Sequence, residues 1–385
     1  MEDELVIGFL SARDPRDKRT WSGIYYMMWK ALEKQFPKVI LLGPVKLPLF
    51  FTFIFALLHI IHRFNGKRFN KKNNYLISKY YGYVFNKKLK RKKIDVLFAP
   101  TASVEIAYLN TRLPICYYSD SSFGQLNEYY ASFSNFSKSS IKTSNRIEQR
   151  AISNSACNVY PSSWAADYAK LNYKAKNTYV IKMGANIDIP PTKSEVTKHY
   201  NHKIKLLFLG VDWKRKGGDI VLETVEQLTK KGYDFQLMVC GCKPAREHPH
   251  ITAIPFLDKN KAEDRKAFNK LLYDTDILFL PTRAECYGIV FCEANAFGVP
   301  VISTDTGGVS SIIEDGVNGF LLPLTAKAEA YTDKIEYLIN NKNVLKKMSL
   351  KAREKYEEEL NWEVWGKKMR EILLMIFNNE PQKSL

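Results

Sequence analysis

Short apolar segments alternate with helical patterns along this chain, and this alternation constrains the fold more than any other feature. In the first half, the apolar segments stand at 5–10, 94–100 and 157–162. After residue 200, they stand at 203–210, 235–241, 276–281 and 299–305. Strands that alternate with helices form parallel sheets that are covered on both faces. The sequence therefore predicts an α/β protein with two doubly wound, Rossmann-like domains.

The two series are separated by a segment that is typical of a linker. Residues 184–195 contain two adjacent prolines followed by polar residues. Near the C-terminus, residues 361–377 carry apolar side chains at helical spacing, and we expect this helix to pack back across the linker. We predict a first domain at 1–188 together with a C-terminal helix at 362–385, and a second domain at 189–361.

The chain is strongly basic, with a formal net charge of +18. The charge is uneven, because residues 34–94 contain no Asp or Glu and include the basic tract at 87–93. This distribution indicates attraction to a polyanion or to an anionic membrane surface. A nucleic-acid-binding protein is the remote alternative, and no helix-turn-helix, zinc-finger or RNP signature supports it. We therefore predict no nucleic-acid partner.

The cysteines and the N-terminal residues indicate the compartment. The six cysteines are scattered without a metal-binding spacing, and we predict free thiols in a reducing environment. The first residues are acidic and lack the basic segment of a signal peptide. These features together predict a cytoplasmic protein.

Residues 47–61 form an uncharged apolar run of 15 residues. A membrane-spanning helix needs about 20 apolar residues, so this run is too short to cross a bilayer. Two alternatives remain, a buried core helix and an interfacial helix whose basic flank meets lipid headgroups. The acid-free flank favours the second alternative, and we predict peripheral association with an anionic membrane.

The loop at 282–288 is expected to bind a ligand. It follows the predicted strand at 276–281, and ligands in open parallel sheets lie beyond the carboxyl ends of the strands. A helix is predicted to begin near Ile289. The N–H groups of Tyr287, Gly288 and Ile289 would be donors at a helix N-terminus, which suits a phosphate. Gly288 would let the ligand approach the backbone closely.

Two glutamates, Glu285 and Glu293, stand around this turn. Helical side chains lean toward the N-terminus, so the carboxylate of Glu293 can point back to the loop that holds Glu285. Sugar hydroxyls are good donors to carboxylates, and a nucleotide sugar has a sugar ring on either side of its diphosphate, one for each glutamate. The alternative is that Glu293 only complements the helix dipole and that Glu285 is a solvated loop residue.

Three basic residues, Lys214, Arg215 and Lys216, come directly before Gly217 and Gly218 and follow the strand at 203–210. This is not a Walker A loop, because the lysine precedes the glycines and no Ser or Thr follows. By itself the segment is equally a solvated basic turn. Beside the Glu285 loop, we interpret it as a cationic clamp for a diphosphate.

Residues 208–223 and 284–323, together with the Glu-x7-Glu spacing, resemble the retaining family 4 glycosyltransferases of the GT-B fold, or glycosyl transferases group 1. The likeness is dense over 204–325 and weaker in the first half. It implies two Rossmann-like domains that face a cleft, with the C-terminal helix crossing back to the first domain. It also implies that Glu293 holds the ribose and that Glu285 holds the donor sugar.

The same resemblance assigns further roles in the second domain. Lys216 and the Tyr287–Ile289 amides would bind the diphosphate, and Gly307 and Gly308 would shape the donor pocket. Family members usually need no metal, so we predict no cofactor. We expect the nucleobase to contact the backbone near 254–259.

The sequence departs from the family pattern at two places. Val211 stands where the family usually has an arginine, and Arg215 is the candidate replacement. None of the six histidines falls where the family often places one near the donor sugar, and Asp120 is the nearest polar candidate. Asp120 is equally explained as a turn or cap residue. Ser22 and Gly23 are expected at a helix start facing the acceptor and phosphate, although a plain N-cap explains Ser22 equally well.

The resemblance implies a retaining glycosyltransferase that moves a hexosyl unit from a nucleotide-diphosphate sugar to a glycan or lipid-linked acceptor in surface-glycan biosynthesis. Glu285, Asp120 and Lys216 are the candidate catalytic residues. The alternative within the same fold is a nucleotide-sugar epimerase or hydrolase. An acceptor requirement distinguishes transfer from these two reactions.

Overall fold

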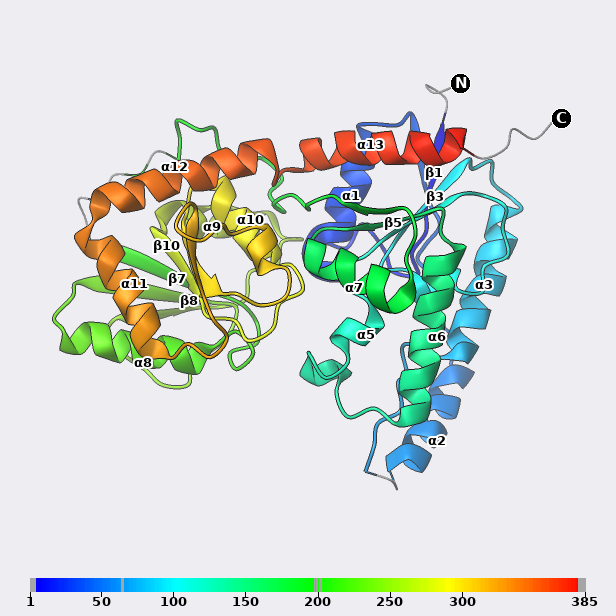
Figure 1. Ribbon diagram of the computed structural model, residues 1–385, viewed down its shortest axis with the longest axis horizontal. Helices are drawn as coiled ribbons and strands as arrows, with labels where there is room; N and C mark the ends of the chain where they lie inside the picture. Colours follow the sequence, from blue (N-terminus) through cyan, green and yellow to red (C-terminus); the bar gives the residue numbers. More distant parts are fainter. Residues whose placement is uncertain (1–4, 64–65, 197, 199, 201–202, 380–385) are drawn as a thin grey trace. The chain divides into compact units, whose positions relative to one another are not determined.

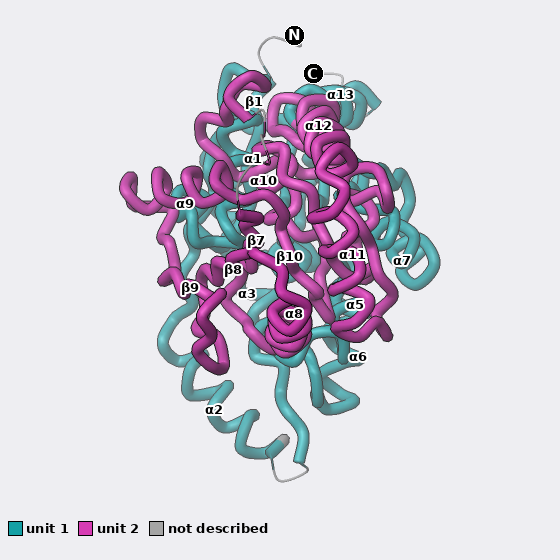
Figure 2. The backbone as a smooth tube through the Cα atoms, turned by 90° about the vertical axis from the view of Figure 1, so that its left-hand side faces the viewer, with its two compact units in different colours: residues 1–181, 366–385 teal, residues 182–365 magenta. Residues whose placement is uncertain are grey.

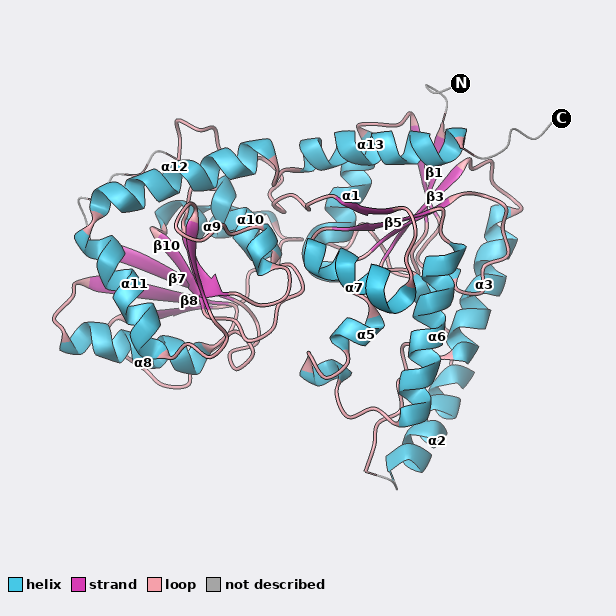
Figure 3. Ribbon diagram, viewed as in Figure 1, coloured by secondary structure: helices cyan, strands magenta, loops and turns pink. Residues whose placement is uncertain are grey.

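The computed structural model describes residues 5–379 apart from 64–65, 197, 199 and 201–202. The chain forms two compact units, residues 1–181 with 366–385 and residues 182–365 (Figure 2). In each unit a parallel sheet is flanked by helices (Figures 1 and 3). The prediction of an α/β protein with two Rossmann-like units is confirmed.

In the first unit, the described strands form one parallel sheet in the order β2-β1-β3-β4-β5-β6. The strands are β1 (Val6–Phe9), β2 (Lys38–Leu41), β3 (Val96–Pro100), β4 (Ile115–Tyr118), β5 (Cys157–Tyr160) and β6 (Thr178–Val180). The helices are α1 (Ile24–Glu33), α2 (Phe50–Arg63), α3 (Tyr75–Leu89), α4 (Ser103–Ile106), α5 (Phe123–Leu126), α6 (Lys138–Asn154) and α7 (Ser163–Tyr173), with 3-10 turns η2 (Thr20–Gly23) and η3 (Ala131–Phe133). Every residue of β3, β4 and β5 is buried, as expected for strands covered on both faces.

The second unit repeats this plan, and its described strands lie in the order β12-β11-β10-β7-β8-β9, all parallel. The strands are β7 (Ile204–Leu209), β8 (Phe235–Cys240), β9 (Ile251–Ile254), β10 (Ile277–Leu280), β11 (Val301–Thr304) and β12 (Gly319–Leu322). The helices are α8 (Gly218–Lys230), α9 (Ala262–Asp274), α10 (Ile289–Ala296), α11 (Ala328–Asn340) and α12 (Lys342–Glu358), with a 3-10 turn η4 (Val309–Ser311).

The strand order fixes where a ligand is expected in each unit. In the first sheet the chain order reverses between β1 and β3, and in the second it reverses between β7 and β10. Loops that leave two such strands diverge to opposite faces of the sheet, which opens a crevice at the carboxyl ends. The loops after β1, β3, β7 and β10 are therefore the positions to examine for a site.

The last helix, α13 (Trp362–Asn378), belongs to both units. At its start, Trp362 Nε1 donates a hydrogen bond to Asn186 Oδ1 at 3.1 Å in the second unit. Near its end, Tyr179 Oη lies 3.5 Å from Met375 Sδ in the first unit. The contacts divide the chain after Ile181 and again after Trp365, whereas the sequence placed these divisions after 188 and 361.

The apolar run predicted at 47–61 forms most of α2, and it is neither wholly buried nor wholly exposed. Phe51 and Phe55 belong to the core of the first unit. Within the run, the apolar side chains that are at least half exposed are Leu49, Phe50, Phe53, Leu57, Ile60 and Ile61. The described helices include none that is long and apolar enough to cross a membrane. One face of α2 therefore anchors the helix, and the other presents apolar surface.

Candidate functional site

The predicted cationic loop lies at the switch point of the second sheet, between the ends of β7 and β10. Its glycines are required by close packing. A Cβ on Gly217, which has φ of +78°, would lie 2.0 Å from the Pro281 carbonyl oxygen. A Cβ on Gly218 would lie 2.1 Å from the Trp213 ring. The two glycines thus let the loop fold against the end of β10, which carries the next functional loop.

Lys216 is the buried member of this loop, with 6% of its surface exposed. Its side chain runs along Gly210, where a Cβ would lie 3.0 Å from Lys216 Cγ. The ammonium group forms an ion pair with Glu285 Oε2. Arg215 approaches the same oxygen at 3.5 Å and donates to the Ala284 carbonyl at 2.9 Å. The structure thus brings Glu285 and both predicted cations together.

Arg283 connects the two loops, and sequence reasoning assigned it no role. Its guanidinium donates to both carboxylate oxygens of Asp219, at 2.7 and 2.6 Å, and to the Lys214 carbonyl at 2.7 Å. Its backbone N–H donates to the Arg215 carbonyl at 2.8 Å. The hydrogen bond from Arg283 lowers the pKa of Asp219. Arg283 therefore ties the cationic loop to the segment that carries Glu285.

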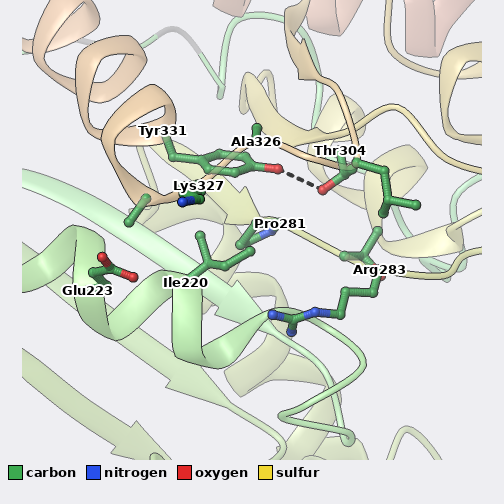
Figure 4. A pocket seen from close by; sticks show the side chains of 11 residues that line it. Ile220, Glu223, Pro281, Arg283, Thr304, Ala326, Lys327 and Tyr331 are labelled. Atoms are coloured by element: carbon green, nitrogen blue, oxygen red, sulfur yellow. Dashed lines mark hydrogen bonds between the residues drawn. The ribbon is translucent and has the colours of Figure 1, made fainter.

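A small pocket borders Arg283 on the side of α8 and α11, with a volume of 190 Å³ (Figure 4). Tyr331 from α11 and Thr304 at the end of β11 share a hydrogen bond of 2.8 Å in its wall. Burial raises the pKa of Tyr331. The pocket contains none of the residues predicted for donor binding.

Glu293 lies inside α10, and 2% of its surface is exposed. Its carboxylate forms an ion pair with Lys259. Burial raises the pKa of Glu293, and the charge and hydrogen bond of Lys259 oppose this shift. The sequence predicted Glu293 but assigned residues 254–259 only backbone contacts to a nucleobase. A buried carboxylate needs a compensating partner, so the burial of Glu293 indicates that a cation lies beside it. The spacing of residues along the sequence does not identify which lysine this is.

Gly288 ends the Glu285 loop and is the N-cap residue of α10, with φ of +92° and no side-chain cap. A Cβ here would lie 2.4 Å from the Phe291 ring, so the turn itself requires glycine. Tyr287 directs its hydroxyl away into the core, where it donates to the Met183 carbonyl at 3.1 Å. The hydroxyl of Tyr287 is therefore not available to a ligand at the turn, and the role of the Tyr287–Ile289 N–H groups stays a prediction.

The predicted pair Gly307 and Gly308 approaches the same loop from the end of β11. The N–H of Gly308 donates to the Glu285 carbonyl at 3.3 Å. Gly307 has φ of +60°, a left-handed conformation that favours glycine. The second unit thus brings Arg215, Lys216 and Gly308 into contact with Glu285 at the loops that follow β7, β10 and β11, whereas Glu293 contacts Lys259 after β9.

Asp120, Ser22 and Gly23 lie in the first unit. Trp21 Nε1 donates to Asp120 Oδ2 at 3.2 Å, which links the η2 turn to the end of β4. Asp120 is not a helix cap, because Ser122 caps α5. The N-cap interpretation of Ser22 is also wrong. Gly23 is the N-cap of α1, with no side-chain cap, and Ser22 has a left-handed φ of +55°.

The sequence predicts free thiols and shows no metal-binding spacing among its cysteines. The residues that the structure describes contain no group of three or more His, Cys, Asp or Glu side chains placed to hold a metal ion. All six cysteines are free thiols.

Residues 191–355 match the family model for Glycosyl transferases group 1. An uncharacterized glycosyltransferase of Methanocaldococcus jannaschii is 29% identical over 160 residues, which are 41% of this chain and 44% of that protein. A capsular polysaccharide biosynthesis glycosyltransferase of Staphylococcus aureus is 25% identical over 175 residues, which are 43% of this chain and 45% of that protein. The matches therefore span less than half the length of these curated relatives.

Solved structures share the fold over almost the whole chain. Sucrose-phosphate synthase of Thermosynechococcus elongatus has a TM-score of 0.69 at 15% identity, with 97% of this chain and 99% of that chain covered. Anabaena HepE in complex with UDP-glucose has a TM-score of 0.60 at 15% identity, with 97% of this chain and 100% of that chain covered. The second unit therefore contains a region that matches the group 1 glycosyltransferases, and the chain as a whole shares the GT-B fold with these solved structures.

Proposed function

We propose that this protein is a retaining glycosyltransferase that moves a hexosyl unit from a nucleotide-diphosphate sugar to a glycan or lipid-linked acceptor in surface-glycan assembly. The observation that carries the proposal is the contact of Glu285 with Lys216 and Arg215 at the switch point of the second unit. The family match and the name of the staphylococcal relative support glycosyl transfer in polysaccharide assembly. The HepE complex supports a nucleotide-sugar donor.

The two cations are suited to the leaving group. When the bond between the sugar and the diphosphate breaks, negative charge develops on the departing oxygen. Lys216 and Arg215 are already held in place by Glu285 and the Ala284 carbonyl, so little reorganisation is needed to stabilise that charge. Glu285, once the diphosphate shares its cations, accepts a hydrogen bond from a hydroxyl of the donor sugar.

In this proposal, Glu293 binds the ribose. Its carboxylate is held by Lys259, and carboxylate oxygens accept several hydrogen bonds, so a ribose diol can be added to the pair. The acceptor hydroxyl attacks from the face that the diphosphate leaves, and a phosphate oxygen takes its proton. No side chain is assigned as a nucleophile.

The donor part of the proposal is tested by a thermal-shift screen against UDP-, GDP-, ADP- and TDP-sugars. We expect one base to stabilise the protein more than the others. NMR of the product with that donor then reports the anomeric configuration, which should be retained. Release of free or epimerised sugar, with no transfer to any acceptor, would identify the enzyme as a hydrolase or epimerase.

We also propose that the reaction needs no metal ion and no cofactor, because Lys216 and Arg215 are positioned to supply the positive charge that a divalent cation gives in other phosphate chemistry. The test is activity in excess EDTA. Undiminished turnover is expected, and a loss that Mg²⁺ or Mn²⁺ restores would contradict this part.

We propose a cytoplasmic protein that associates peripherally with a membrane, and α2 supports the membrane part. The helix exposes apolar side chains on one face, Arg63 at its end is exposed, and so are Lys67, Lys71 and Lys72 in the segment that follows. Interfacial helices combine burial of an apolar face with attraction to anionic lipids, about 1 kcal/mol for each basic residue near the surface. The basic tract at 87–93 lies at the C-terminal end of α3, away from Lys71 and Lys72, which precede the helix. Within the tract, Lys88 donates a hydrogen bond to the Leu42 carbonyl.

Sedimentation with phosphatidylglycerol vesicles tests this location. The Phe53→Ser/Leu57→Ser variant should lose most of its vesicle binding, because both side chains are more than half exposed. The Lys87→Glu/Lys90→Glu variant is the comparison, and it should lose less. Salt should weaken the binding of the native protein. A native protein that stays in the supernatant at low salt would rule out membrane association.

A further inference from the structure

The pocket of 190 Å³ beside Arg283 has no part in the proposed reaction. It lies between the N-terminal turns of α8 and α11, next to the carboxyl ends of β10 and β11 (Figure 4). A cavity of about 150 Å³ holds a molecule the size of benzene. The pocket is therefore large enough for a phosphate ion or a small carboxylate but too small for a nucleotide sugar.

Two buried hydroxyl groups form part of the pocket wall. Thr304 is 2% exposed and Tyr331 is 1% exposed, and their oxygens lie 2.8 Å apart (Figure 4). This hydrogen bond uses the hydrogen of one hydroxyl, and the other hydrogen has no acceptor among the residues that the structure describes. A buried donor without an acceptor is unfavourable. An oxygen atom of a ligand in the pocket would accept this hydrogen.

Two cations line the same pocket. Arg283 donates to Asp219 and to the Lys214 carbonyl, and a guanidinium has more N–H groups than these bonds use. Lys327 is exposed and is the N-cap residue of α11, a helix that no side chain caps. The first N–H groups of a helix have no partner within it. The pocket thus presents positive charge and hydrogen-bond donors together, which suits an oxyanion.

One carboxylate, that of Glu223, also lines the pocket and opposes the binding of an anion. Glu223 is exposed, so solvent screens its charge. Asp219 is outside the lining and is already paired with Arg283. A cation in the pocket would instead meet both Arg283 and Lys327. The charges and the free hydroxyl hydrogen together favour a small oxyanion over a cation.

We propose that this pocket is a second ligand site, which binds a small oxyanion, and that its occupant tightens the binding of the sugar donor. The oxyanion accepts hydrogen bonds from the Thr304–Tyr331 pair and from Arg283, and Lys327 attracts it. Phosphate and carboxylate groups share this chemistry. The ligand is not consumed, and no covalent step is assigned to these residues.

The coupling to the donor rests on the proposed function. Arg283 holds the cationic loop through Asp219 and the Lys214 carbonyl, and Lys216 of that loop is proposed to bind the diphosphate. An anion that contacts the remaining N–H groups of Arg283 leaves these bonds in place and restricts the side chain further. Part of the ordering that donor binding requires is then already present, so the donor binds more tightly.

Isothermal titration of the full chain with inorganic phosphate and with acetate, at constant ionic strength, tests the proposal. Tighter binding of phosphate identifies a phosphate as the ligand group, and tighter binding of acetate identifies a carboxylate. The titrations are repeated with saturating nucleoside diphosphate, chosen among UDP, GDP, ADP and TDP by its affinity. The probe should then bind about fivefold more tightly, and the nucleotide should gain the same factor from the probe. A probe that binds at the donor loops would instead be displaced by the nucleotide.

Variants assign the binding to the pocket. Lys327→Glu should weaken the probe by about tenfold, because an attraction becomes a repulsion, and should leave the nucleotide Kd without probe unchanged. Lys347→Glu makes the same charge change at an exposed position of α12 and should have no effect. Thr304→Val/Tyr331→Phe removes both hydroxyls at nearly constant volume and should weaken the probe several-fold. If this variant fails to fold, Lys327→Glu decides.

Two further variants separate this site from other interpretations. Lys216→Ala should lose nucleotide binding and keep probe binding, because Lys216 lies outside the pocket lining. Glu223→Gln should tighten the probe slightly, because it removes a repulsion. Weaker binding of the probe by Glu223→Gln would indicate that the pocket prefers a cationic group and would overturn the proposal.

The remaining outcomes distinguish the two parts of the proposal from the proposed function. Equal probe binding by the native protein and Lys327→Glu, or no probe binding at all, would show that the pocket is not an oxyanion site. Binding in the pocket that leaves the nucleotide Kd unchanged or weakens it would overturn the coupling alone. If the native protein binds no nucleotide, the proposed function and the coupling both fail, and the comparison of Lys327→Glu with Lys347→Glu still decides the pocket.

Discussion

The two units hold their glutamates with different kinds of partner. In the second unit, Glu285 is paired with Lys216 and Glu293 with Lys259. In the first unit, Glu105 has the Ala12 N–H as its partner and Glu148 has the Tyr117 hydroxyl. The fold is the same, so the difference comes from the side chains that surround each glutamate.

This difference affects the protonation of the buried carboxyls. A buried charge is stable only with a partner, and a group with a neutral partner is driven toward its uncharged form. Burial accordingly raises the pKa of Glu105 and of Glu148 to about 7. The second unit pairs each of its two glutamates with a lysine, although burial also raises the pKa of Glu293, whereas the buried carboxyls of the first unit have neutral hydrogen-bond partners.

The largest effect is expected where the charge pair of the second unit is broken. Lys216→Ala removes the buried cation nearest Glu285 and should lower kcat/KM by about 100-fold or more, the size seen when a donor that stabilises developing charge is lost. Arg215→Ala should cost less, because its distance to Glu285 is 3.5 Å and it is only the candidate replacement for the family arginine. Steady-state kinetics with the preferred donor measures both changes.

Equal, mild losses in Lys216→Ala and Arg215→Ala would mean that the diphosphate is bound elsewhere. Lys216→Arg is the matched control, because it keeps the charge while changing the shape of the donor group. It should recover part of the lost kcat/KM.

The two glutamates of the second unit should separate binding from turnover. Glu293→Ala leaves a ribose hydroxyl and Lys259 without their acceptor, which should weaken donor binding by about 1–3 kcal/mol. Glu285→Ala should instead lower kcat, because this residue is proposed to contact the transferred sugar. Calorimetric Kd values for the donor and single-turnover rates distinguish the two. Native affinity and native rates in both variants would refute the site.

The parts of this site that could be predicted are those that lie within short segments. The pair Glu285 and Glu293, the Lys216–Gly217–Gly218 turn and the strands on either side carry local patterns, and the structure places them together. The roles of Lys259 and Arg283 were not predicted. Their partners, Glu293 and Asp219, lie on other segments of the chain and come close to them only in the folded structure. Ion pairs between loops depend on three-dimensional placement, which spacing along the chain does not encode.

The first unit was harder for the same reason. Glu148 lies in α6 within a polar stretch that, by composition, is typical of a solvated helix face, and its burial depends on contacts with β4, such as that from Tyr117. Residues 47–61 left two alternatives open because an apolar run does not show which face will meet the core. Phe51 and Phe55 are buried while Phe53 and Leu57 are exposed, so each alternative describes one face of α2.

The protonatable carboxyls of the first unit predict a dependence of stability on pH. Each has a pKa of about 7 in the folded chain, against an ordinary value of 4.5 for a glutamate. The folded state therefore binds more protons between these two values, and the free energy of unfolding should fall as pH rises through this window and level off above it. Burial raises the pKa of the tyrosines around the two groups, which include Tyr25 and Tyr117, so they stay neutral in this window, and the charge of Arg13 opposes the rise at Glu105.

Urea denaturation from pH 5 to pH 8 measures this dependence. Glu105→Gln/Glu148→Gln should flatten the fall and raise the free energy of unfolding at pH 8 by on the order of 1–2 kcal/mol, because an amide carries no charge to bury. Glu293, whose pKa is also raised by burial, contributes a residual fall that this variant keeps. Glu371→Gln, at an exposed position, should follow the native curve. A native curve that rises across the window would contradict the account.

The smallest effect is expected at Arg283, which positions the cations without being placed near the donor itself. Its ion pair with Asp219 is partly exposed, and such pairs contribute at most about 1 kcal/mol to stability. Arg283→Ala should therefore leave the melting temperature almost unchanged but raise KM for the donor several-fold, because the Lys214 carbonyl and Asp219 lose the hydrogen bonds from the guanidinium that hold the loop. Arg283→Lys keeps the charge but cannot donate to both oxygens of Asp219, so its KM should stay close to that of Arg283→Ala. Asp219→Asn retains one acceptor oxygen for Arg283, so it should raise KM less than either Arg283 variant. If the KM of Arg283→Lys equals the native value, the charge of residue 283 is sufficient and its hydrogen-bond geometry is not required. The difference between the two units would then lie in their net charge and not in the geometry that holds the cations.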